Sequence, residues 1–251
     1  MANIIRCKLP DGVHRFKPFT VSDYRDFLLV RNDLTDKDLN EQEELIDEMT
    51  LDYFPNYTKS RRHHIFLSAF LGSIGKTKVP IVYECPICGK EQKRLFNLSP
   101  KPLTNPVVEL QDGISLEFNF PDEVSDDPAE MALNSVKAVY QNGNRFEWGN
   151  LPQEKRDEVL NLIEFDAFEK IIQAMKPFHY EMNLRCCEST TLVYDDLCSI
   201  FKLLINPDEV FPFYEINHIL AKHKYSIESI MNMLPIERSI ALSLIEKDNK
   251  K

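Results

Sequence analysis

The chain has 251 residues, of which 43% are hydrophobic and 28% are charged, a composition typical of a folded globular protein. Its formal net charge is -10 and its sequence pI is near 5.2. This charge disfavours the capture of nucleic acid or anionic lipid, because their affinity comes largely from Lys and Arg. No run of about 18 apolar residues is present, and the opening residues lack the apolar core of a secretory signal. We therefore expect no membrane span and a protein as the binding partner.

The first 77 residues predict a β-hairpin followed by helices. The hairpin turns at Pro10-Asp11-Gly12, where proline presets φ and glycine permits a tight turn. Thr20 or Ser22 is suited to cap the first helix, and Thr35 with Asp38 three residues later resembles a capping box before the second. Helical periodicity predicts helices over residues 20–32, 35–52 and 60–75.

The middle of the chain changes from strand patterns back to helical ones. Residues 78–120 predict a meander of hairpins, with short β-type runs at Val79–Tyr83, Arg94–Phe96, Val107–Leu110 and Ile114–Phe118. Residues 121–129 are acidic and contain proline, so they predict a linker, followed by a helix. Asn142-Gly143 marks a tight turn. Helical periodicity returns over residues 152–176, with a break near Glu164.

The last part of the chain predicts a second hairpin and then helices only. The hairpin runs from Phe178 through Cys186-Cys187 to Tyr194. Helix starts are expected at Asp195, Pro207, Ser226 and Pro235. The elements together predict a helix-rich α+β fold. We expect one intertwined body in four parts: residues 1–77, hairpin and helices; 78–120, a β-hairpin region; 121–177, acidic linker and helices; and 178–251, second hairpin and C-terminal helical region.

Cysteine spacing gives the strongest chemical signal. Cys85 and Cys88, with Gly89 after them, have the form of a zinc knuckle, in which two thiolates two residues apart bind one ion. A structural zinc site needs four ligands, so a second pair must come from elsewhere in the chain. Cys186 and Cys187 also occupy a predicted hairpin tip, as in a split zinc ribbon. We therefore predict structural Zn2+ bound by Cys85, Cys88, Cys186 and Cys187.

The adjacency of Cys186 and Cys187 departs from the usual two-residue gap. Neighbouring side chains of an extended strand point to opposite faces, so both thiols reach one ion only if the backbone turns sharply. Otherwise the fourth ligand is His179, Glu188 or water. In a reducing cytoplasm the remaining cysteines, Cys7 and Cys198, are interpreted as core residues rather than as disulfide partners.

Motifs of catalysis are missing from the sequence. It contains no GxSxG, HExxH, GxxxxGK[ST] or GxGxxG pattern, so we predict a protein that is not an enzyme. The stretch from Phe211 to Pro235 is rich in aromatic and long aliphatic side chains and is the predicted partner surface. Its predicted contact residues are Phe211, Phe213, Tyr214, Ile216, Ile219, Met231 and Met233. The alternative is that these residues form core, and the alternative functions are a zinc-dependent enzyme and a zinc-ribbon nucleic-acid binder.

Several segments together resemble the baseplate hub assembly proteins of T-even bacteriophages. They are the opening Ile4–Gly12 with Phe16–Thr20, the knuckle Glu84–Lys90, the Cys186-Cys187 pair, and the ending from Asn206–Glu209 through Glu237–Ser239 to Glu246–Asp248. The resemblance covers essentially the whole chain. It implies a phage protein made in the host bacterial cytoplasm, which helps to build the tail baseplate hub as an assembly factor or chaperone, or as a minor hub subunit. Its implied partners are other baseplate hub proteins, and it brings no catalytic residues.

Overall fold

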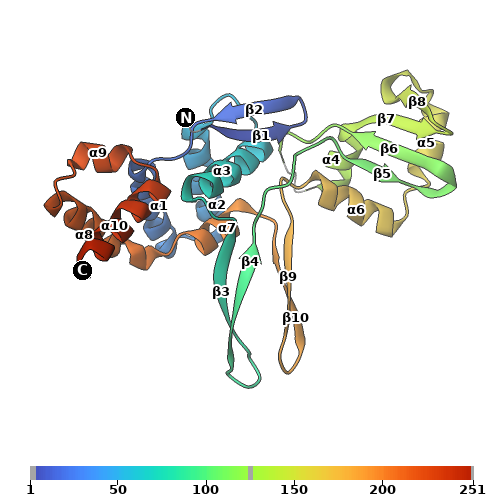
Figure 1. Ribbon diagram of the computed structural model, residues 1–251. Coiled ribbons are helices and arrows are strands. Elements are labelled where there is room, and N and C mark those ends of the chain that lie inside the picture. The colour runs from blue at the N-terminus through green and yellow to red at the C-terminus, as the bar shows by residue number, and fades with distance from the viewer. Residues whose placement is uncertain (1–3, 124–126, 250–251) are drawn as a thin grey trace.

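The computed structural model describes residues 4–123 and 127–249. Residues 1–3 of the predicted N-terminal part, 124–126 of the predicted linker and 250–251 of the predicted C-terminal region lie outside the described residues. The fold is α+β, as predicted, with helices gathered at one side, a smaller sheet unit at the other, and two hairpins projecting between them (Figure 1).

The N-terminal part consists of one hairpin and three helices, as predicted. Its elements are β1 (Ile5–Leu9), β2 (Gly12–Phe16), α1 (Val21–Asp33), α2 (Leu39–Tyr53) and α3 (Lys59–Ile74). Thr20 caps α1 in a capping box with Asp23. The predicted box of Thr35 with Asp38 is wrong, because Asp38 is itself the cap of α2 and pairs with Glu41. Thr35 lies instead in a short 3-10 turn, Leu34–Asp36.

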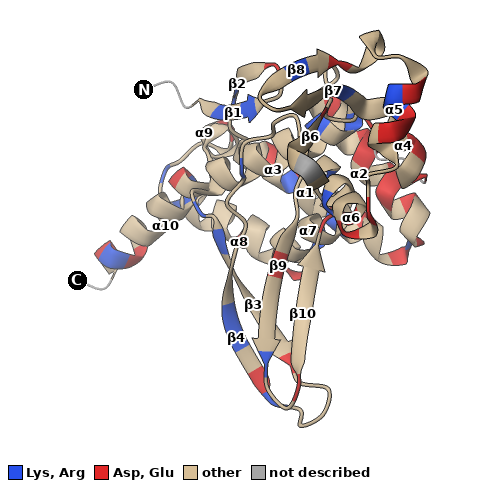
Figure 2. Cartoon of the chain, turned by 90° about the vertical axis from the view of Figure 1, so that its right-hand side faces the viewer, with Lys and Arg blue, Asp and Glu red and all other residues tan. Residues whose placement is uncertain are grey.

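Two antiparallel hairpins project from the helices, and we call them the arms. The first arm consists of β3 (Lys78–Glu84) and β4 (Glu91–Asn97), and the second of β9 (Tyr180–Arg185) and β10 (Ser189–Tyr194). The arms lie side by side with their tips away from the helices, as two views at right angles show (Figures 1 and 2). The second predicted hairpin is therefore confirmed, and it lies next to the first.

The part of the sequence between the two arms forms a middle unit, which consists of a four-stranded antiparallel sheet and three helices. It comprises β5 (Val107–Glu109), β6 (Ile114–Phe118), β7 (Val136–Gln141), β8 (Asn144–Glu147), α4 (Pro128–Ser135), α5 (Gln153–Leu160) and α6 (Phe165–Met175). The four strands predicted over residues 78–120 are all present, but they do not form one meander, since they divide between the first arm and this sheet. The predicted turn at Asn142-Gly143 is confirmed, with φ of 51° and 79°, and it joins β7 to β8.

Four helices follow the second arm, close to the predicted starts. They are α7 (Leu197–Leu204), α8 (Val210–Lys222), α9 (Ile227–Asn232) and α10 (Pro235–Asn249). Asp196 caps α7, one residue after the predicted start, and Pro207 opens a 3-10 turn, Pro207–Glu209, before α8. Ser226 caps α9.

Two hydrophobic cores hold the molecule together. The main core joins the N-terminal hairpin, helices α1 to α3 and the C-terminal helices, which together we call the body, and it also includes the bases of the arms. The second core lies inside the middle unit, between the sheet and α4 and α6. Over the described ranges, none of the helices combines the length and the apolar character that crossing a bilayer requires.

Candidate metal centre

The tip of the first arm folds as a zinc knuckle. The amide of Gly89 donates to the Cys85 carbonyl at 2.9 Å, and the amide of Cys85 donates to the Lys90 carbonyl at 3.1 Å. Gly89 has a φ of 66°, in the left-handed region that favours glycine, so it reverses the chain directly after Cys88. This turn places the thiols of Cys85 and Cys88 on the same side of the tip.

The backbone at the tip of the second arm turns at its two adjacent cysteines. Arg185 pairs with Ser189, so Cys186, Cys187 and Glu188 form a three-residue loop outside the strands. The amide of Cys186 donates to the Glu188 carbonyl at 3.1 Å across this loop. The backbone therefore turns at the cysteines, and both thiols can face the first arm.

The four thiols form one cluster between the two tips. The Sγ atoms of Cys85, Cys88, Cys186 and Cys187 all lie within 4.8 Å of one another, and Cys88 Sγ is 3.5 Å from Cys186 Sγ. A disulfide would need about 2.05 Å, so the thiols are free. A tetrahedral ion with sulfur at about 2.3 Å separates its ligands by about 3.8 Å. The cluster has the size and donor set to hold a metal ion.

Side chains behind the tips keep the arms in register. Tyr83 Oη donates to Thr190 Oγ1 at 3.3 Å, and Gln92 Nε2 donates to the Arg185 carbonyl at 2.9 Å. Each contact joins the first arm to the second. The geometry of the thiol cluster therefore depends on both hairpins and on their packing.

Hydrogen bonds and neighbouring thiols give the cysteines of the cluster different pKa values. Backbone amides of Cys88, Cys187 and Ile87 donate to the Cys85 sulfur and lower its pKa to about 6. The side-chain hydrogen bond with Cys88 raises the pKa of Cys187 to about 12 and also raises the pKa of Cys186. The thiolate is therefore favoured at Cys85 and the thiol at Cys186 and Cys187. A bound cation would favour the thiolate at every position.

The alternative fourth ligands lie outside the cluster. His179 at the base of the second arm has its Nε2 2.7 Å from Glu181 Oε1, and neither His179 nor Glu188 belongs to the four-sulfur group. Cys7 and Cys198 are buried in the main core, as predicted. Among the described residues, the sequence motif and the three-dimensional cluster involve the same four side chains.

Two family models match the chain and together span almost all of it. Residues 1–202 match the family of the T4 bacteriophage base plate protein. Residues 204–250 match the C-terminal domain of the baseplate hub assembly protein Gp51. The chain belongs to the T4-like baseplate hub assembly family. The predicted resemblance is confirmed, and no curated protein and no solved structure matches the chain.

The two predicted sites of this baseplate hub assembly family member fall within different family matches. All four clustered cysteines lie within the first match, and the predicted partner surface lies within the second. The family indicates a structural or assembly role with contacts to other baseplate proteins and association with the tail baseplate.

The structure separates the seven predicted contact residues by exposure. Phe211 is 76% exposed and Tyr214 is 52% exposed, whereas Phe213 is 2% exposed and belongs to the main core. The remaining four are half-buried against that core: Ile216, Ile219, Met231 and Met233. Three further exposed aliphatic residues follow one another at four-residue spacing along α10: Ile236, Ile240 and Leu244. Sequence reasoning missed this stripe, although the spacing itself is its signal.

Proposed function

We propose that this baseplate family member is an assembly chaperone for the tail baseplate hub, acting in the host bacterial cytoplasm through protein contacts. The observation that carries the proposal is the exposed apolar surface within the segment that matches the hub assembly domain. Large exposed apolar side chains concentrate where partners bind, and aromatic residues dominate binding energy. The surface consists of Phe211, Tyr214, Ile227, Ile236, Ile240 and Leu244.

Capture of a hub protein tests this surface. We expect that Phe211→Asp with Tyr214→Asp abolishes co-purification with a co-expressed baseplate hub protein and leaves the melting temperature unchanged, because both side chains are exposed. The matched control is Val13→Asp with Leu39→Asp, two exposed apolar residues of the N-terminal part. Capture that survives in the first variant, or that is lost equally in the control, contradicts the proposed surface.

A chaperone and a minor hub subunit differ in where the chain ends up. A chaperone binds hub intermediates and is missing from finished particles, whereas a subunit remains at constant stoichiometry. Quantitative mass spectrometry of purified phage particles and of hub intermediates separates them. Presence of this chain in finished particles at the copy number of a hub protein would assign it the subunit role.

We further propose that the cysteine cluster binds structural Zn2+. Four thiolates complete a tetrahedral site and leave no position for a reacting water, which is the arrangement of structural rather than catalytic zinc. This donor set argues against the zinc-dependent enzyme. The ribbon-like nucleic-acid binder is disfavoured by the net charge of -10, although Lys90, Lys93 and Arg94 lie on the first arm.

Metal analysis tests the zinc proposal. Protein purified without chelators should contain one zinc per chain by plasma mass spectrometry, and Cys85→Ser with Cys88→Ser should contain none. Cobalt substitution should give the spectrum of four-sulfur tetrahedral coordination. Iron in place of zinc, or a cobalt spectrum with bound water, would reject the proposed site. The control is Cys7→Ser, which changes a buried thiol outside the cluster.

A further inference from the structure

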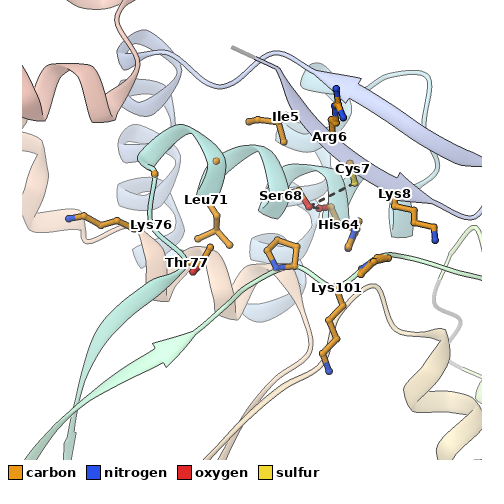
Figure 3. A pocket seen from close by; sticks show the side chains of 14 residues that line it. Ile5, Arg6, Cys7, Lys8, His64, Ser68, Leu71, Lys76, Thr77 and Lys101 are labelled. Carbon is orange, nitrogen blue, oxygen red and sulfur yellow. Dashed lines mark hydrogen bonds between the residues drawn. The ribbon is translucent and has the colours of Figure 1, made fainter. Parts of the chain in front are cut away.

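A cavity of about 420 Å³ lies between β1, the C-terminal half of α3 and the segment Pro100–Pro102 (Figure 3). Its lining includes apolar Ile5 and Leu71. Gly72 contributes no side chain, and a Cβ there would come within 2.8 Å of Ile5 Cδ1, so glycine lets Ile5 lie against α3. Burial lowers the pKa of His64, which also lines the cavity, so its imidazole is neutral at pH 7. The inner wall of the cavity is therefore uncharged and combines apolar Ile5 and Leu71 with the neutral polar groups of His64 and Ser68.

The lining of this cavity has only positive charges at pH 7. Arg6, Lys8, Lys76 and Lys101 contribute to it, and Asp and Glu do not. None of the four cations forms an ion pair with a residue that the structure describes. In a chain with 40 acidic and 30 basic residues, such a group creates a local positive potential. It favours an acidic ligand.

The outer edge of β1 adds directional hydrogen-bonding groups to the cavity. The Lys8 carbonyl accepts from the Leu103 amide at 2.9 Å, so the backbone groups of Lys8 face away from β2. In an antiparallel pair these groups alternate, so the N–H and C=O of Arg6 face the same outer side. Pro100 and Pro102 have no N–H to donate. No described residue outside the hairpin forms a backbone hydrogen bond with Arg6.

The arrangement of the cations fits charge distributed along a chain. Arg6, Lys76 and Lys101 extend from different sides of the cavity and do not converge on one point (Figure 3). A compact anion such as inorganic phosphate would need converging donors. An extended peptide can instead pair with a free strand edge and place alternate side chains in an apolar pocket and toward the charges.

We propose that this cavity binds an extended acidic peptide segment of a partner protein. The segment pairs with the backbone of Arg6, places an apolar side chain on Ile5 and Leu71, and directs its carboxylates to the surrounding cations. This inference rests on the proposed chaperone role in one respect, because that role determines which protein supplies the segment. The cavity adjoins the N-terminal hairpin, and at Gly75 it comes close to Ile236 of α10, whereas Phe211 and Tyr214 do not line it.

Fluorescence anisotropy with defined peptides tests the proposal on the purified full chain. The probe is a fluorescein-labelled octapeptide that alternates Asp or Glu with Leu or Val. We expect it to bind, and we expect affinity to fall at least tenfold in Arg6→Glu with Lys101→Glu. The control variant, Lys170→Glu with Lys247→Glu, changes exposed cations elsewhere and should bind as the native chain does. Circular dichroism verifies that both variants are folded.

Two further probes separate the parts of the interaction. Replacing the acids of the octapeptide by Lys should abolish binding, and N-methylation of its alternate backbone amides should weaken binding at least tenfold if strand pairing occurs. The proposal is overturned if the native chain does not bind the acidic octapeptide or if the Arg6 and Lys101 variant binds it equally. Tighter binding of a single-stranded oligonucleotide at the same residues also overturns it. Failure of the native chain to capture a hub protein, while it still binds the acidic octapeptide, would reject the chaperone role alone.

Discussion

The body and the arms are stabilised in different ways. The body is filled with aromatic side chains, and Phe27, which is 0% exposed, packs against Phe66 and Phe19 with ring centroids 5.1 and 4.8 Å away. Beyond their bases, the arms bury few apolar side chains, such as Ile81 and Leu184, and are joined by two hydrogen bonds and by the thiol cluster at the tips. The difference indicates that damage to the body should be global, whereas damage to the arms should stay local.

The largest effect should come from truncating the centre of the body. Phe27→Ala should lower the free energy of unfolding by about 3–5 kcal/mol, because it leaves a cavity in a fully buried aromatic cluster. Denaturant unfolding measures the change. The matched control is Leu29→Ala on the same helix, which is half-exposed and should cost about 0.5 kcal/mol. Equal effects of the two substitutions would show that the aromatic cluster does not dominate the body.

Acid should also weaken the body, through His63. Burial lowers the pKa of His63 to about 4, and nearby Lys59 acts in the same direction. In the unfolded chain the pKa is near 6.5, so between these values the unfolded state binds more protons. Stability should therefore be constant above about pH 6.5 and fall by at most about 3 kcal/mol as the pH falls to 4.

Denaturant unfolding at several pH values checks the histidine prediction. It should be measured on the Cys85→Ser, Cys88→Ser background, which removes the arm thiol whose pKa is lowered into the acid range. His63→Gln should reduce the fall in the free energy of unfolding with acid. A residual fall should remain in this variant, because the pKa of His64 is also lowered. His223→Gln, at an exposed position, is the control. An unchanged slope in His63→Gln would contradict the prediction.

The smallest effect on the body should come from removing the metal-binding thiols. Cys88→Ser with Cys186→Ser should make the arms at least ten times more sensitive to trypsin, which can cut at Lys90, Lys93 and Arg185. The near-ultraviolet circular dichroism of the body should stay unchanged, because its core does not depend on the arm tips. Global loss of that signal would show that the arms and body unfold as one unit.

Local sequence signals predicted most elements, and they failed where tertiary pairing decides. The turn residues of the N-terminal hairpin and the knuckle at Cys85 and Cys88 act over a few residues, so their structures follow from sequence. Strands β7 and β8 were missed because α4 runs directly into β7 without a loop, although Asn142-Gly143 marked their turn. The capping box was assigned one turn too early because Asp38 can serve either as cap or as partner.

The thiol cluster could be predicted by ligand count, but its geometry could not. Nothing in the Cys186-Cys187 pair specifies a loop of three residues, and the sharp turn that the site needs follows from the pairing of Arg185 with Ser189. The residues of the predicted partner surface likewise could not be separated into exposed and buried ones from the sequence. Phe211 and Phe213 are equally aromatic, and only packing against Tyr24 and Arg238 makes Phe213 a core residue.

The path of the chain makes the middle unit an insert between the two arms. The chain leaves the first arm at Leu98 and returns at Tyr180, and Tyr180 Oη donates to the Leu98 carbonyl at 3.1 Å, so the two ends of the unit meet. Among the described residues, the second core is formed by side chains of the middle unit itself. We therefore expect the strands and helices of this unit to tolerate changes in length, provided that Leu103, Phe120 and Phe178, which belong to the main core, stay in place.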